Sequence, residues 1–497
     1  MELNEFGNKA ENLLKLADFV ETLDQAGELL RIKLEVSPEL EVAEITDRVS
    51  KSKGGGPALL FENVAGSEMP LLINAFGSYQ RMSLALGVKD IQEVAEEIGD
   101  LIKIKPPQTI FEKVQILSTL SKLTKFPPKQ VRNGSCQEIV LTEEKIDLDK
   151  IPIIKCWPED GGKYVTLPQV ITKGLEHGDR NVGMYRMQKI DKRTFAMHWQ
   201  IHHDGAKHCR EYFQAGKQMP VAVAIGGDPV MTYAATAPLP TGIEEFLFAG
   251  FLRKSNVTLV KCKTVDLSVP ADADIVFEGY IEPNQTCLEG PFGDHTGYYS
   301  LADQYPVFHL TAITHRQNPI YQTIIVGKPP MEDYYMGKAT ERIFLPLLKT
   351  QFPELVDMNL PIFGIFHNFA FISIDKRYPF QAKKMMHSFW GFGQLMFSKI
   401  IVVVDKDVNV QDTDEVWFRV GSSVDPKRDI TFVDGPVDVL DHAAPLLGAG
   451  SKMGIDATKK WPEEGFQREW PEEIQMSEEM TEFVDKRWES YGFPSEL

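Results

Sequence analysis

Two carboxylic acids, Glu289 and Asp294, lie in the segment EGPFGDHTGYY (289–299). Their odd offset would direct the two side chains to opposite faces of a straight strand. Glycines and a proline stand between them, so we expect the backbone to turn and return both acids to one cavity. Acids in different surroundings can divide into a proton donor and an ionised partner. The pair predicts acid–base chemistry, and a loop with solvated acids is the alternative.

Histidines mark a second candidate site, in RTFAMHWQIHHD (193–204). The alternating apolar residues predict a strand, on which His198, Gln200 and His202 would share one polar face. Two histidines on one face can bind a metal or an anion. A polar face with ordinary hydrogen bonds is the alternative, and the residues alone favour it. No HExxH motif is present, so a zinc protease has no support.

A helix is predicted over TGIEEFLFAGFLRK (241–254), because Thr241 and Glu244 have the spacing of a capping box. Glu245 is not needed for that cap. It could serve as a hard oxygen ligand for a metal, or it could simply complement the helix dipole. Lys399 precedes the apolar strand IIVVV, where a lysine could meet a phosphate, although a solvated lysine is the more common outcome.

The bulk composition is that of an ordinary globular protein, and the net charge makes nucleic acid an unlikely partner. A formal charge of −18 repels phosphate backbones and disfavours a polybasic membrane anchor. The five cysteines are widely spaced without a CxxC pair, which indicates reduced thiols. The N-terminus lacks the features of a signal peptide. We therefore expect a cytoplasmic protein, with peripheral contact to a membrane left open.

Element patterns along the 497 residues predict an α+β multidomain fold. Helical and strand patterns mix at the start. Many short strands with Gly/Pro turns then follow, with one short helix between them, which suggests a barrel or sandwich. An α/β pattern and an acidic, Trp-rich tail end the chain. The expected domains are an α+β domain (1–125), a split β-barrel domain (126–330) and an α/β oligomerisation domain with its acidic tail (331–497).

An ordered set of further segments runs over nearly the whole chain. It comprises GGPALLFENV (55–64), IPIIKCWPEDGG (151–162), NVGMYRMQ (181–188), TAPLPTGIEEFLFAGFLR (236–253), GKPPMED (327–333) and GIDATKKWPEE (454–464). Together with EGPFGDHTGYY, this set resembles the UbiD family of reversible aromatic-acid decarboxylases. The ordered collection is highly specific, although no single segment would be.

The resemblance implies a prenylated FMN cofactor, made by a separate flavin prenyltransferase. It also implies Mn2+ (or Mg2+) at the cofactor phosphate, with K+ nearby. The family's metal ligands correspond to Asn181, His202 and Glu245, and one imidazole with oxygen ligands suits such a hard ion. Its cofactor contacts correspond to Met184, Tyr185, Arg186, His198, Trp199, Gln200, His203, Asp204 and, at the phosphate, Lys399.

The family's catalytic network corresponds to Arg186, Glu289 and Asp294. Many members have Glu as the last acid, whereas the quinone-pathway branch has Asp. We expect Arg186 and Glu289 to hold the substrate carboxylate, with Asp294 the first choice of proton donor over Glu289. On a regular strand, where successive side chains point to alternate faces, Asn181 and Arg186 would lie on opposite faces. We therefore predict a bulge or strong bend, with Gly183 its expected place.

The expected substrate follows from three segments that are most similar to the quinone-biosynthesis branch of the UbiD family: HWQIHHDG, TYAATAPLP and GIDATKKWPEEG. The expected substrate is a dihydroxynaphthoate (1,4-dihydroxy-6-naphthoate) of menaquinone biosynthesis. A second candidate substrate, 4-hydroxy-3-polyprenylbenzoate of ubiquinone biosynthesis, has nearly equal support. A homo-oligomer, dimer to hexamer, is implied by the resemblance alone.

Two alternatives of other classes remain open from the residues. One is a split-barrel protein that carries or reduces FMN without decarboxylation, which would not require the two acids. The other is a metal-dependent hydrolase built on His198, His202 and Glu245.

Overall fold

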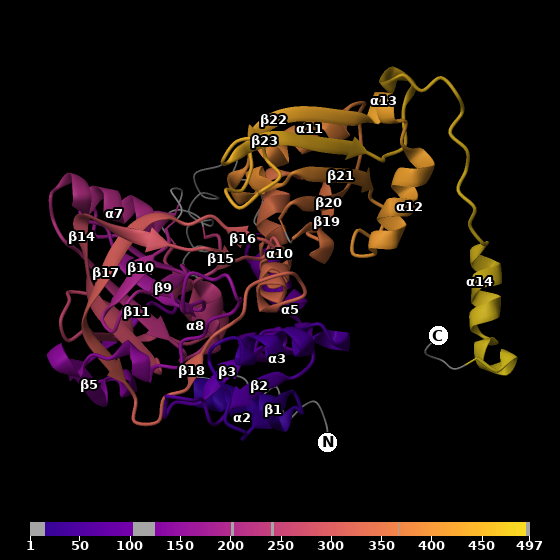
Figure 1. Cartoon of the computed structure of the whole chain (residues 1–497). Coiled ribbons are helices and arrows are strands. Elements are labelled where there is room, and N and C mark those ends of the chain that lie inside the picture. Colours follow the sequence, from indigo (N-terminus) through magenta and orange to yellow (C-terminus); the bar gives the residue numbers. More distant parts are fainter. Residues whose placement is uncertain (1–14, 103–124, 200–202, 240–242, 366, 494–497) are drawn as a thin grey trace.

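The computed structural model describes residues 15–102, 125–199, 203–239, 243–365 and 367–493. It is a mixed α+β multidomain fold (Figure 1). None of its described helices is long and apolar enough to cross a membrane. All five cysteines are free of disulfide bonds.

Within residues 15–102, the N-terminal segment combines the helices α2, α3, α4 and α5 with strands of a four-stranded sheet of order β1-β2-β3-β18. The helix α2 (Leu16–Gln25) buries Leu16, Phe19, Val20 and Leu23, which is the spacing of one apolar helix face. The fourth strand, β18 (Tyr321–Gln322), comes from the range expected to be the central domain. The other elements are β1 (Leu29–Ile32), α3 (Glu41–Ser50), β2 (Ala58–Phe61), β3 (Leu71–Ile73), α4 (Tyr79–Leu86) and α5 (Ile91–Ile102).

The central segment is built on a nine-stranded, mainly antiparallel sheet, ordered β6-β9-β10-β17-β14-β11-β7-β8 with β5 also paired to β17. Its strands are β5 (Ile139–Thr142), β6 (Tyr164–Val165), β7 (Gln169–Lys173), β8 (Arg180–Gly183), β9 (Met187–Lys189), β10 (Thr194–Met197), β11 (Met219–Ile225), β14 (Ile275–Glu289) and β17 (Asp303–His315).

Curling of this sheet follows from its connections. The strand β8 lies at one edge and β9 lies next to the other edge, yet only residues 184–186 join them. An extended chain advances about 3.5 Å per residue, so the end of β8 and the start of β9 are within about 14 Å. The two edges of the sheet therefore approach each other, and the sheet forms a half-barrel.

Three expectations for this segment are corrected. The strand expected over 193–204 ends at Met197, where its pairing with β9 stops, and Asp204 already begins the helix α7 (Asp204–Gln214). The single short helix is also wrong, since α7, α8 (Pro229–Ala234) and α9 (Glu245–Arg253) all interrupt the strands. The helix α9 begins at Glu245 with Glu244 as its N-cap, so the capping box starting at Thr241 is wrong. Thr241 itself lies outside the described residues.

Smaller elements complete the central segment. One sheet has the order β13-β12-β4, and a two-stranded hairpin pairs β15 with β16. Their bounds are β4 (Lys129–Val131), β12 (Thr258–Lys261), β13 (Ser268–Pro270), β15 (Phe292–Gly293) and β16 (Tyr299–Ser300). Figure 1 shows the β15/β16 hairpin between the half-barrel and the C-terminal sheet.

The C-terminal segment has the predicted α/β character. The helix α10 (Glu332–Gln351) packs on α5 and on β19, and thereby joins it to the N-terminal segment. Its five-stranded sheet comprises β19 (Leu355–Asn359), β20 (Phe369–Ile374), β21 (Ile400–Asp405), β23 (Ala449–Asp456) and β22 (Ile430–Pro436). The remaining helices are α11 (Gln381–Trp390), α12 (Thr413–Ser423), α13 (Pro426–Asp429) and α14 (Glu478–Asp485), the last of which stands away from the body (Figure 1).

Candidate active site

Arg186 joins the two predicted acids. Its Nε donates to Glu289 Oε1 at 2.8 Å, its Nη2 to Glu289 Oε2 at 3.2 Å and its Nη1 to Asp294 Oδ2 at 2.6 Å. The side chains are 10% (Arg186), 0% (Glu289) and 7% (Asp294) exposed. Nη2 also donates to Ser300 Oγ at 3.0 Å. The structure therefore brings the three predicted catalytic residues into one buried cluster.

The backbone between the acids turns as the glycines and the proline predict. The strand β14 ends at Glu289, and Gly290 then adopts a φ of +94°, a conformation that favours glycine. After β15, Gly297 (φ +80°) closes the hairpin, and the Asp294 N–H donates to the Tyr298 carbonyl at 3.0 Å. This turn directs Asp294 back to Arg186.

Both acids are ionised in this arrangement. Burial opposes ionisation, but His295 and Arg186 together hold the pKa of Asp294 well below its usual range. For Glu289, hydrogen bonds from His198 and Arg186 likewise outweigh burial and lower its pKa. An ionised carboxylate cannot donate a proton. Asp294 can therefore act as the predicted donor only after it has received a proton.

His198 lies beside Glu289 beyond the end of β10. Its Nδ1 is 3.0 Å from Glu289 Oε2, and its ring stacks on Tyr305 with centroids 4.2 Å apart. Burial lowers the pKa of His198. Within the described part of the chain, the buried His198 Nε2 and Trp199 Nε1 have no hydrogen-bond partner. Buried polar atoms are nearly always satisfied, so these two nitrogens are suited to a ligand.

The strand β8 ends at Gly183, where a bulge or strong bend is predicted. Because β9 begins only at Met187, no single regular strand runs from Asn181 to Arg186. A Cβ on Gly183 would lie 2.2 Å from the Tyr185 ring, which explains why a glycine is required. The Tyr185 hydroxyl accepts from Asn181 Nδ2 at 3.2 Å, and its ring lies 5.0 Å from that of His203.

We predict that Gly183→Ala displaces the Tyr185 ring and destabilises the protein by about 1–3 kcal/mol, because overpacking a filled core has that cost. Thermal unfolding and flavin retention would measure the effect. Gly421→Ala in α12 is the matched control, since a Cβ there meets nothing within 4 Å. An unchanged melting temperature for Gly183→Ala would show that Tyr185 does not pack against this glycine.

Two of the three predicted metal ligands lie close together. Glu245 Oε2 accepts from the Val182 backbone N–H at 2.9 Å, beside Asn181. Burial raises the pKa of Glu245 to about 7, and the charge of the nearby Asp204 acts in the same direction. The third expected ligand, His202, lies outside the described residues, as does Gln200. No group of three His, Cys, Asp or Glu side chains that could hold a metal occurs among the residues that are described.

The remaining predicted cofactor contacts are divided between two places. Met184 lies in the connection between β8 and β9, packed against the core, with its N–H on the Ala235 carbonyl at 3.1 Å. Lys399 lies in the C-terminal segment and forms an ion pair with Asp441 at 2.7 Å. Its contact with a cofactor phosphate stays a prediction.

Sequence reasoning gave no role to His295, although it directly follows Asp294. Its backbone N–H and its Nδ1 both lie 2.8 Å from Asp294 Oδ1. Its Nε2 lies 2.8 Å from Nε2 of His367, in the C-terminal segment. The position of His295 directly after a candidate acid indicates a possible role in the site. Nothing in the sequence around His367 indicates that it lies close to this acid.

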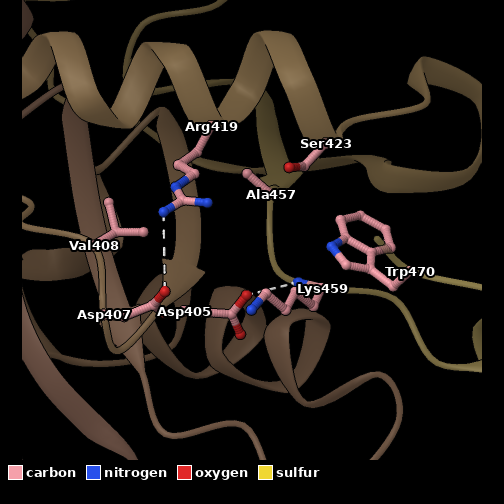
Figure 2. A pocket seen from close by; sticks show the side chains of 8 residues that line it. All are labelled: Asp405, Asp407, Val408, Arg419, Ser423, Ala457, Lys459 and Trp470. Carbon is pink, nitrogen blue, oxygen red and sulfur yellow. Dashed lines mark hydrogen bonds and ion pairs between the residues drawn. The ribbon is translucent and has the colours of Figure 1, made fainter. Parts of the chain in front are cut away.

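A separate small hollow in the C-terminal segment is not a substrate site. Figure 2 shows that it is lined by Asp405, Asp407, Arg419, Lys459 and Trp470, among others. Its volume is about 10 Å³, which suffices for about one water molecule.

Comparison with known proteins shows that the chain belongs to the UbiD family. Residues 129–329 match the 3-octaprenyl-4-hydroxybenzoate carboxy-lyase Rift-related domain, residues 334–457 the C-terminal domain and residues 20–102 the N-terminal domain. An uncharacterized protein of Archaeoglobus fulgidus is 51% identical over 475 residues, which cover 95% of this chain and 97% of that protein.

Solved structures agree with this membership. The vanillic acid decarboxylase of Sedimentibacter hydroxybenzoicus in its closed form has a TM-score of 0.84 at 29% identity, covering 96% of this chain and 99% of that chain. Its open form has a TM-score of 0.79. The UbiD-class enzyme HmfF of Pelotomaculum thermopropionicum, in complex with FMN, has a TM-score of 0.77 at 29% identity, covering 92% and 97%. An evolved dimeric HmfF was solved with prFMN.

This chain is therefore an enzyme of the carboxy-lyase class, with the fold of UbiD-class aromatic acid decarboxylases.

Proposed function

We propose that this enzyme catalyses the prenylated-FMN-dependent, non-oxidative decarboxylation of an aromatic acid in quinone biosynthesis. The observation that carries the proposal is the buried bridge from Arg186 to both Glu289 and Asp294. A protein that only carries or reduces FMN does not require two acids on one arginine. The bridge therefore disfavours that alternative.

The residues present fit the cofactor. His198 Nε2 and Trp199 Nε1 are buried donors or acceptors without a hydrogen-bond partner in the described ranges, and both belong to the expected flavin contacts. Glu245 and Asn181 supply oxygen donors of the kind that Mn2+ or Mg2+ prefers, with His202 as the expected third ligand. When bound, the modified flavin supplies an electron sink for the electron pair left as CO2 departs.

Arg186 is placed to orient the substrate carboxylate. Its hydrogen bonds to Glu289, Asp294 and Ser300 engage four N–H groups, and a guanidinium has five. The remaining Nη1 hydrogen can therefore bind an incoming carboxylate. Glu289, held on two sides by Arg186 and His198, fixes the plane of the guanidinium.

Asp294 then delivers the proton that replaces CO2. A substrate carboxylate that shares Arg186 weakens the hold of this cation on Asp294 and adds a negative charge nearby. Both effects raise the pKa of Asp294, which can then take up a proton and pass it to carbon.

The leading substrate is 1,4-dihydroxy-6-naphthoate of menaquinone biosynthesis. Its support is the likeness of HWQIHHDG, TYAATAPLP and GIDATKKWPEEG to the quinone-biosynthesis branch. The second candidate is 4-hydroxy-3-polyprenylbenzoate, which the name of the matching family models favours. A flavin prenyltransferase would supply the cofactor, Lys399 would contact the cofactor phosphate, and K+ would lie near the divalent ion. Assembly into a homo-oligomer would involve the C-terminal segment.

Purification after co-expression with a flavin prenyltransferase tests the proposal. We expect a flavin absorbance spectrum and metal-dependent CO2 release from one of the two candidate acids. Release from the naphthoate alone would assign the menaquinone route, and release from the prenylated benzoate alone would replace it with the ubiquinone route. A protein without flavin that releases no CO2 from any aromatic acid would refute the proposal.

A further inference from the structure

A chain of hydrogen bonds leads from the acid pair into the C-terminal segment. Arg186 holds Asp294 Oδ2, while Asp294 Oδ1 is 2.8 Å from His295 Nδ1. His295 Nε2 is in turn 2.8 Å from His367 Nε2, with the two rings at 68°. His367 lies between η5 (Ile362–Gly364) and β20, so the last contact joins two parts of the fold.

The direction of these bonds follows from the charge of Asp294. Because this carboxylate is ionised and can only accept, His295 Nδ1 must carry a hydrogen and donate it. Burial opposes a charge on His295, but the Asp294 carboxylate, together with Asp333 and Asp438, raises its pKa. A protonated His295 also carries a hydrogen on Nε2, which it donates to His367.

His367 is correspondingly neutral. Burial and the positive charge of His295 lower the pKa of His367 to about 4, although Asp438, Asp294 and Asp441 oppose this. Asp441 is itself paired with Lys399. A neutral imidazole can accept through Nε2, so the two rings together hold one positive charge next to Asp294.

We infer that His295 stores the proton that Asp294 delivers to the substrate carbon, and that His367 is the positioning residue that holds this imidazolium in place. The inference rests on the proposed decarboxylation, which consumes one proton for every CO2 released. Asp294 is buried and ionised, so the reaction needs a proton source in contact with it. His295 Nδ1 is such a source.

The proton transfers balance as follows. When the substrate carboxylate engages Arg186, the Nδ1–H bond of His295 breaks and an O–H bond forms on Asp294. That O–H bond then breaks as the C–H bond of the product forms. After the product leaves, solvent returns one proton to His295 Nδ1.

The variant His295→Gln tests whether His295 stores the proton that Asp294 delivers. We expect kcat to fall about 100-fold, the lower end of the effect of general acid–base groups, with KM within about threefold. The wild-type enzyme needs a protonated His295, so its kcat should decline as pH rises through the raised pKa of His295. The variant should lack this decline. His387→Gln, an exposed histidine on α11, is the control and should leave both kcat and the pH profile unchanged.

Two variants of His367 separate positioning from packing. His367→Gln keeps an oxygen that accepts from His295 and should retain kcat within about threefold. His367→Phe keeps the ring volume but no acceptor, and should lower kcat about tenfold or more. It should also move the high-pH decline to lower pH, because the protonated His295 loses a hydrogen bond. A packing role predicts the reverse order, with Phe tolerated and Gln impaired.

A second readout needs neither cofactor nor turnover. Imidazole C2–H exchange, followed by mass spectrometry against pH in the purified full-length protein, gives a midpoint for each histidine. We expect the His295 midpoint to lie above about 6.5 and to fall in Asp294→Asn. The His367 midpoint should rise in His295→Gln, since the neighbouring charge is gone.

These measurements distinguish two failures. A wild-type enzyme without any CO2 release, but with the expected exchange midpoints, would refute the decarboxylation and keep the charged histidine pair. If the wild-type enzyme decarboxylates and the variant His295→Gln keeps kcat within twofold and still loses activity at high pH, His295 does not store the proton. A His295 midpoint that Asp294→Asn leaves in place would refute this role of His295 as well.

Discussion

Arg186→Met should lower kcat/KM by about 1,000-fold or more. The substitution removes the cation that holds Glu289 and Asp294 and that is placed to bind the substrate carboxylate. Losing one preorganised donor to a reacting group already costs about 10²–10³-fold, and this change also leaves two buried carboxylates without their partner. Steady-state kinetics of CO2 release would measure the loss.

Arg186→Lys is the matched variant, since it keeps the positive charge. A lysine cannot reproduce the planar fork that reaches both acids, so we expect it to recover little of the activity. Circular dichroism and flavin content would show whether each variant is folded and loaded. A folded, loaded Arg186→Met with activity within tenfold of the wild type would contradict the role of Arg186.

Asp294→Asn should lower kcat by about 10²–10⁴-fold with a small change in KM, because an amide cannot deliver the proton to carbon. Residual product formed in D2O would show slow deuterium uptake after CO2 loss. Asp294→Glu is the control that restores a carboxylate, and we expect it to recover part of kcat, since many family members have Glu at this place.

The variant Glu289→Gln distinguishes the role of Glu289 from that of Asp294. Glu289 holds Arg186 and His198 but is not our donor, so its loss should weaken substrate binding together with kcat. If Asp294→Asn kept normal turnover and deuterium incorporation while Glu289→Gln lost them, Glu289 would be the donor.

Local chemistry made much of the site predictable from the sequence. The glycines and proline between Glu289 and Asp294 predict a turn, and the structure has Gly290 at positive φ directly after Glu289. The conflict between Asn181 and Arg186 on one strand predicts a bulge or strong bend near Gly183, and the structure ends β8 at that residue.

Other features depend on contacts distant in sequence and could not be predicted. The alternation of apolar and polar residues in RTFAMHWQIHHD is typical of a long strand. However, the pairing of β10 with β9 ends at Met197, which lies opposite the first residue of β9. The acidic Asp204 then suits a helix N-terminus. The hydrogen bond between His295 and His367 joins residues 72 positions apart, and no local pattern marks the second one.

The most direct test of the decarboxylase assignment is the ratio of deuterium to CO2 when the loaded enzyme turns over 1,4-dihydroxy-6-naphthoate or 4-hydroxy-3-polyprenylbenzoate in D2O. We predict one deuterium in the product for each CO2 released, at the carbon that carried the carboxylate. Failure of the flavin-loaded enzyme to release CO2 from these or any other aromatic acids, or a product without deuterium at that carbon, would contradict the decarboxylase assignment.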